Sequence, residues 1–112
     1  MEKLLWRRLK KLGNYRANIF QLTNQNFHKY YYLVNPNGLS RSKHENHLDH
    51  IYTVIDGFKN SVPPEVVASP INLQMLTAFE NNNKSDRSDM TKETLYELYN
   101  QFKKEWISER FW

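Results

Sequence analysis

The sequence predicts an α+β fold in which a two-stranded antiparallel ribbon is flanked by N- and C-terminal helices. Apolar residues recur at helical spacing near both ends of the chain. Between them stand two strand-like runs, separated by a segment with one glycine and three prolines. Because 112 residues allow one modest core, we expect a single domain over 1–112. Its parts are a basic helical part (1–34), a central unit (47–85) and a C-terminal helix (91–110).

The N-terminal part is predicted to be helical and strongly basic. Leucines at positions 4, 5, 9 and 12 recur near the helical period, and Gly13 is expected to end this first helix. A second helical pattern runs from Tyr15 to about Leu33, although its "YYYLV" stretch also suits a strand. Residues 1–30 hold seven basic side chains against Glu2, a net charge of +6, and the rest of the chain carries −2. This charge suits a polyanion such as DNA, and a solvated helix face accounts for it equally well.

The central unit is predicted to contain both strands. Residues 47–54 favour the first strand because Leu, Ile, Tyr and Val suit a half-buried pleated surface. The segment "IDGFKNSVPPEVVASP" reads as a connection with a helical turn beginning at Pro64 or Glu65. The second strand lies in "INLQMLTAF", and a helix or a tight loop follows Thr77.

The C-terminal helix is predicted from a cap and an apolar stripe. The Thr91 hydroxyl is expected to cap its first turn. The stripe that should face the core consists of Leu95, Leu98, Tyr99, Phe102 and Trp106.

Several classes of function are disfavoured by composition. The chain has no cysteine, which excludes a disulfide framework, a cysteine nucleophile and thiolate zinc sites. No window approaches the roughly 20 apolar residues of a membrane span, and the N-terminus lacks a signal-peptide pattern. We expect a cytoplasmic protein with no membrane partner.

The residues most suited to chemistry are Asp49 and His50, together with Asn72 and the asparagines at 81–83. A divalent ion on a scissile phosphate takes oxygen ligands, which Asp and Asn side chains supply. Histidine is the side chain whose ordinary pKa suits a general base near neutral pH. Adjacent strand residues point to opposite faces, so Asp49 and His50 can share a site only at a bulge or a strand end.

These residues carry a resemblance to a known family. "HLDHI" followed by "NLQMLTAFENNNK" resembles the HNH, or ββα-metal, nucleases, and "NPNGLSRS" and "GFKNSVPPEVVASPINLQML" look like its small phage-encoded and homing-type members. The family pattern has a His on the first strand, an Asn that opens the second, and a His or Asn nine residues later, followed by a basic residue. The matching positions here are His50, Asn72, Asn81 and Lys84.

The resemblance implies a metal-dependent DNA endonuclease. Asp49 and Asn81 would bind one divalent ion, Mg²⁺ with Mn²⁺ as a substitute, and His50 would be the general base. Asn72 would hold the loop between the strands and help to orient His50 without touching the metal. If the protein is phage-encoded, it would act in a bacterial host cell.

The chain departs from the family pattern in two respects. The last position of the family pattern is often His, whereas the matching residue here is Asn81. An asparagine ligand favours a hard ion over zinc, and Asn82 or Asn83 could occupy this position in place of Asn81. The paired CxxC zinc clusters of many members are absent, so the flanking helices should brace the motif instead.

Other residues are candidates for DNA contact. His47 is a weaker site candidate, either beside the ligands or on a phosphate, unless it simply faces solvent. The predicted phosphate contacts, each also compatible with a solvated helix face, are Arg7, Arg8, Lys10, Lys11, Lys84 and Arg87.

Two alternatives of other classes remain open. The chain could keep the fold as a non-catalytic DNA-binding or packaging accessory protein. It could also be a zinc-stabilised interaction module with His44, His47, Asp49 and His50 as ligands. A homodimer is also possible, since a small nuclease without a separate recognition domain could gain specificity from a dimer.

Overall fold

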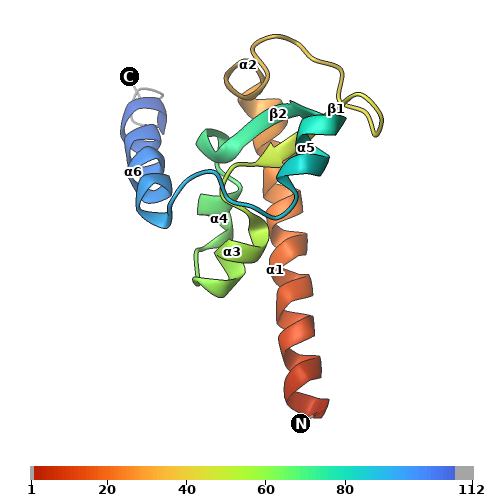
Figure 1. Cartoon of the computed structure of the whole chain (residues 1–112). Helices are drawn as coiled ribbons and strands as arrows, with labels where there is room; N and C mark the ends of the chain where they lie inside the picture. Colours follow the sequence, from red (N-terminus) through yellow and green to blue (C-terminus); the bar gives the residue numbers. More distant parts are fainter. Residues whose placement is uncertain (1, 108–112) are drawn as a thin grey trace.

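The computed structural model describes residues 2–107 and has a mixed helical and sheet architecture (Figure 1). A two-stranded antiparallel sheet lies among helices, which agrees with the predicted α+β class. The elements in chain order are α1 (Glu2–Lys29), α2 (Tyr31–Val34), β1 (Asn46–His50), α3 (Val54–Lys59), α4 (Pro64–Val67), the 3-10 helix η1 (Pro70–Asn72), β2 (Leu73–Thr77), α5 (Ala78–Lys84), α6 (Lys92–Phe102) and the π-helix η2 (Lys103–Ile107).

The sheet is shorter than predicted. β1 and β2 pair without a bulge, from Asn46 opposite Thr77 to His50 opposite Leu73. The predicted first strand continued to residue 54, but the chain leaves the sheet after His50. After the chain leaves the sheet, the Thr53 hydroxyl accepts a hydrogen bond from the Asp56 amide and so caps α3.

Helix α1 is continuous, so the prediction that Gly13 ends a first helix was wrong. A glycine inside a helix costs only about 1 kcal/mol relative to alanine. Gly13 also lacks the positive φ typical of a glycine that terminates a helix, which Gly38 alone among the described glycines adopts. The "YYYLV" stretch forms α2 at the end of α1 and contributes no strand.

The starts of α4, α5 and α6 lie where the sequence signals predicted them, and a helix, not a tight loop, follows Thr77. α4 begins at Pro64. Thr77 and Glu80 form a capping box at the start of α5, each bonding to the backbone of the other. Thr91 caps α6 by accepting from the Thr94 amide, and positions 108–110 of the predicted C-terminal helix lie outside the described residues.

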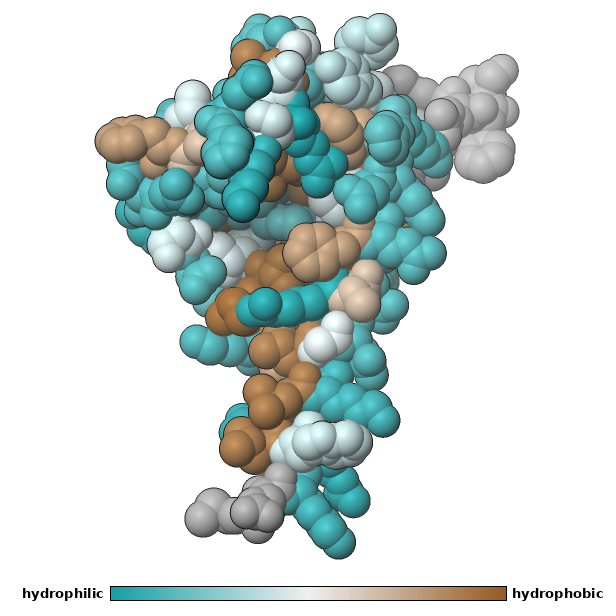
Figure 2. Space-filling view, turned by 90° about the vertical axis from the view of Figure 1, so that its right-hand side faces the viewer, coloured by the Kyte–Doolittle hydropathy of each residue, from teal (hydrophilic) through white to brown (hydrophobic). Residues whose placement is uncertain are grey.

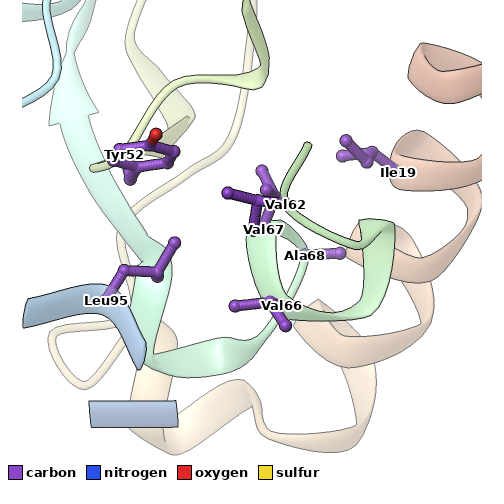
Figure 3. Packing of buried hydrophobic residues seen from close by; sticks show 7 residues of the cluster. All are labelled: Ile19, Tyr52, Val62, Val66, Val67, Ala68 and Leu95. Carbon is purple, nitrogen blue, oxygen red and sulfur yellow. The ribbon is translucent and has the colours of Figure 1, made fainter. Parts of the chain in front are cut away.

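The main core joins α1, the segment between the strands, and α6 (Figure 3). Its buried members are Ile19, Tyr52, Val62, Val66, Val67, Ala68 and Leu95. A second cluster of Phe27, Val34 and Leu73 holds the C-terminal part of α1 against the sheet. Asn26 adds a hydrogen bond of 2.9 Å from its Nδ2 to the Ala68 carbonyl. The C-terminal half of α1 is thereby fixed beside both strands.

Gly57 in α3 gives a test of this packing. A Cβ at this position would clash with the Tyr15 hydroxyl and approach Val67 Cγ2 to 2.8 Å. We expect Gly57→Ala to lower the free energy of unfolding by about 1–3 kcal/mol, because overpacking displaces fixed neighbours. Gly13→Ala is the matched control: nothing lies within 4 Å of its Cβ, and it should raise stability by up to about 1 kcal/mol. Urea unfolding of the two variants measures both effects, and equal stabilities would contradict this packing.

The N-terminal half of α1 projects from the rest of the molecule (Figure 1). Figure 2 shows apolar side chains in a strip along this projecting part, with hydrophilic ones beside them. Leu5, Trp6 and Leu9 are each about 60% exposed. Despite this strip, no helix among the described residues has the length and apolar character required to cross a bilayer.

Candidate functional site

Asp49 is a buried acid near the end of β1. Its side chain is held from two sides. Gln74, directly opposite in β2, donates from Nε2 to Asp49 Oδ2 at 2.9 Å. The Lys84 ammonium, from α5, lies 3.3 Å from the same oxygen and 3.4 Å from Oδ1. The carboxylate therefore has a fixed place between the sheet and α5.

Lys84 is buried with Asp49, which does not fit its predicted role as a phosphate contact. The residue is only 3% exposed, and its Nζ also donates to the His50 carbonyl at 3.0 Å. A buried carboxylate needs a nearby positive charge, because desolvation of an unpaired ion is costly. Sequence alone placed Lys84 on a polar helix surface, whereas the structure turns it toward this carboxylate.

His50 is the last residue of β1 and faces α1, on the opposite side of the ribbon from Asp49. Its Nε2 lies 2.9 Å from Oγ1 of Thr23, a buried residue of α1. Burial is the main cause that lowers the pKa of His50 from 6.5 to about 4. The Asp49 charge opposes this shift, and the charges of Lys84 and Arg41 add to it. The imidazole is therefore neutral at pH 7, the protonation state that a general base requires.

The low pKa of His50 predicts an acid-sensitive fold. The unfolded state binds this proton near pH 6.5 and the folded state only near pH 4, so stability is lost as the pH falls through that window. We expect the wild type to lose about 1 kcal/mol more per pH unit between pH 6 and 4.5 than His50→Gln does. Urea unfolding in EDTA at several pH values measures this, and parallel pH profiles for the two proteins would contradict it.

Asn72 ties together the segment between the strands. The residue is fully buried, and its side chain makes three hydrogen bonds. Its Oδ1 accepts from the Tyr52 amide at 2.7 Å, and its Nδ2 donates to the carbonyls of Tyr52 (2.9 Å) and Val67 (2.8 Å). Its own carbonyl accepts from the Ile51 amide at 2.8 Å. Asn72 thus fixes the path of the chain immediately after His50.

Asn81 lies on the first turns of α5, where it contacts the predicted accessory residue His47. Asn81 Nδ2 is 2.8 Å from His47 Nδ1, and His47 Nε2 is 2.7 Å from the Lys43 carbonyl. Because only a protonated Nε2 can bond to that carbonyl, Nδ1 accepts from the asparagine. The Asn81 Oδ1 makes no hydrogen bond to any described residue, so it is available as a ligand.

A cavity of about 220 Å³ brings three predicted residues together. Asp49, His50 and Asn81 all line it, whereas Asn72 is buried and does not line it. His47 instead lines a neighbouring hollow that shares Leu48 and Asn81 with the cavity. The end of β1 allows Asp49 and His50 to reach one cavity from opposite faces of the ribbon, without the bulge considered from sequence.

The donor set at the cavity fits a hard divalent ion. Asp49 and Asn81 supply oxygen atoms, and Mg²⁺ is commonly held by one or two protein ligands together with water. Within residues 2–107 no three His, Cys, Asp or Glu side chains form a metal-binding group, so the zinc alternative through His44 has no assembled site there. Since Lys84 contacts Asp49, an ion bound there would compete with the ammonium.

The predicted basic residues of α1 are remote from the cavity. Arg16 lines the cavity, and Arg7 precedes it by nine residues, which corresponds to about two and a half turns of the helix. Arg7 therefore lies on the opposite side of α1 from Arg16. Lys10 and Lys11 likewise fall on sides that face away. Arg8 and the predicted contact Arg87 are exposed, and Arg87 pairs with Asp89 at 3.1 Å.

Several site residues were missed from sequence. Arg16 and Phe20 of α1 line the cavity, Thr23 contacts His50, and Gln74 contacts Asp49. The spacing of four between Arg16 and Phe20 places them on one helix face, a signal present in the sequence. The contact between Gln74 and Asp49 follows from the register in which β1 pairs with β2. That register could not be predicted without knowing where the two strands begin and end.

Comparison of the chain with protein-family models, with curated proteins and with solved structures gave no match.

Proposed function

We propose that the chain is a metal-dependent DNA endonuclease of the ββα-metal kind. The observation that carries the proposal is the cavity in which Asp49, His50 and Asn81 converge from β1 and α5. The antiparallel pair β1–β2 followed directly by α5 supplies the strand, strand and helix order of that motif. The net charge of +6 on the first thirty residues suits DNA as the substrate.

In the proposed reaction His50 accepts a proton from water. The tautomer with a hydrogen on Nε2 donates to Thr23 Oγ1, which leaves the Nδ1 lone pair to take this proton. The water oxygen forms a bond to phosphorus as the bond to the 3′ oxygen breaks, which leaves a 5′ phosphate, and the 3′ oxygen takes a proton from solvent water to become a 3′ hydroxyl. Asp49 and Asn81 would hold the divalent ion, which when bound neutralises phosphate charge and stabilises the leaving oxygen.

Two neighbours support this geometry. Asn72 fixes the backbone that follows His50, and Gln74 fixes Asp49 Oδ2. These contacts limit movement of the base and of the metal ligand, and such preorganisation lowers the cost of reaching the reactive arrangement.

Plasmid cleavage tests the proposal. The wild type should nick or linearise supercoiled plasmid with Mg²⁺ or Mn²⁺ and should lose this activity in EDTA. Asp49→Asn should lower the rate at limiting metal because an amide binds a hard cation more weakly than a carboxylate. Asp89→Asn is the control, since Asp89 is an exposed partner of Arg87 outside the cavity. Cleavage unaffected by EDTA would refute the metal-dependent reaction.

The Lys84–Asp49 ion pair favours the second candidate, a non-catalytic DNA-binding protein of the same fold. There the ammonium would serve permanently as the counter-charge of Asp49, with no exchange for a metal ion. Such a protein would shift plasmid in a gel equally well with Mg²⁺ and with EDTA and would leave it intact.

A further inference from the structure

Arg16 and Phe20 stand on α1 at the cavity, and neither is explained by the packing of the protein. Both side chains are exposed, Phe20 to 57%, and both line the cavity that contains His50. Arg16 makes no ion pair or side-chain hydrogen bond with any described residue. Phe20 is outside both clusters of the core.

The rest of the same helix face is buried and fixed. Ile19 and Thr23 are at most 2% exposed, and Thr23 contacts the proposed base. Arg16 and Phe20 are separated by four residues, about 6 Å along the helix axis. The guanidinium group of Arg16 and the aromatic ring of Phe20 therefore lie on the same side of α1, next to the proposed scissile site.

We propose that Arg16 and Phe20 form a nucleotide-binding subsite beside the cleavage site. Arg16 binds a phosphate that flanks the scissile one, because its guanidinium forms paired hydrogen bonds with phosphate oxygens. Phe20 stacks on the base of the adjoining nucleotide, because every base offers a π face to an aromatic ring.

This subsite specifies a class of substrate. A base face is accessible to Phe20 only where the base is unstacked from its neighbour, as in single-stranded, mismatched or kinked DNA. The subsite therefore favours DNA with an unpaired nucleotide beside the cut over continuous duplex. The inference rests on the proposed function for the position of the cut, but the binding of the nucleotide does not depend on cleavage.

Binding of a fluorescein-labelled oligothymidine, followed by anisotropy in EDTA, tests the subsite without any reaction. Phe20→Ala should weaken binding about tenfold, the loss expected for one stacked base. Phe79→Ala is the matched control, since Phe79 is 74% exposed on α5 and does not line the cavity. Arg16→Gln should also weaken binding and lower the slope of log K against log salt by about 0.7, and Lys59→Gln, which removes an exposed charge from α3, is its control.

The outcomes separate this inference from the proposed function. If the wild type cuts plasmid but Phe20→Ala binds as Phe79→Ala does, the subsite is refuted and the nuclease stands. If binding depends on Phe20 and Arg16 but neither plasmid nor the oligothymidine is cut with any metal, the subsite stands and the nuclease is refuted. A wild type that does not bind the oligonucleotide would overturn the subsite.

Discussion

His50→Ala is expected to lower the rate of plasmid cleavage by about 10²–10⁴-fold, the usual contribution of a general base. The truncation removes the nitrogen that would accept the water proton and leaves Asp49 and Asn81 in place. The rate should therefore fall with saturating Mg²⁺ as well as with limiting Mg²⁺. Initial rates of nicking at a series of metal concentrations measure the effect.

His28→Ala is the matched control for this experiment. His28 is an exposed histidine of α1 outside the cavity, so its removal should leave the cleavage rate unchanged. A thermal unfolding curve for each variant checks that the loss of the Thr23 contact has not unfolded His50→Ala. A folded His50→Ala protein that cuts at the wild-type rate would show that another group accepts the proton.

Asn72→Ala is expected to cause the largest loss of stability, about 3 kcal/mol or more. The substitution leaves the Tyr52 amide and the carbonyls of Tyr52 and Val67 without their partner in a fully buried place. Each such buried polar group costs about 1–3 kcal/mol. For a domain of this size the melting temperature should fall by about 10 °C or more, measured by circular dichroism.

Two further variants sharpen this second prediction. Asn72→Asp keeps an acceptor for the Tyr52 amide but loses both donors, so it should also be strongly destabilised. Asn100→Ala changes an exposed asparagine of α6 and should melt close to the wild type. A wild-type melting temperature for Asn72→Ala would contradict the role given to its three hydrogen bonds.

Local signals predicted much of the fold. Thr77 and Thr91 begin helices because their hydroxyls satisfy first-turn amides, a relation readable from neighbouring residues. Pro64 begins α4 for a similarly local reason, its fixed φ. The length of β1 was mispredicted because strand propensity continues through Val54, whereas Asn72, twenty residues after Tyr52, binds the chain that leaves the sheet.

The candidate site was predictable only in part, because the charged residues that pair there are far apart in the sequence. The spacing from Asn72 to Asn81 pointed to the residues around the cavity. Nothing local to Lys84 shows that it is buried against Asp49, since that contact spans 35 positions. Arg16 reaches the cavity for the same reason: α1 passes beside the end of β1, and no residue near Arg16 in the sequence indicates that contact.

The projection of α1 is expected to divide one helix into two cooperative units. From Tyr15 onward the helix shares the core, so its amide hydrogens should exchange only when the domain unfolds. Residues 2–12 belong to neither core cluster, so this part of the helix depends mainly on helix propensity as it extends the turn already formed at Tyr15. We expect this segment to open by local unfolding before the rest of the domain, and any partner that binds it as a helix must then offset the entropy of ordering it. The affinity of this segment for such a partner therefore depends partly on the helix propensity of its residues, including residues that do not contact the partner.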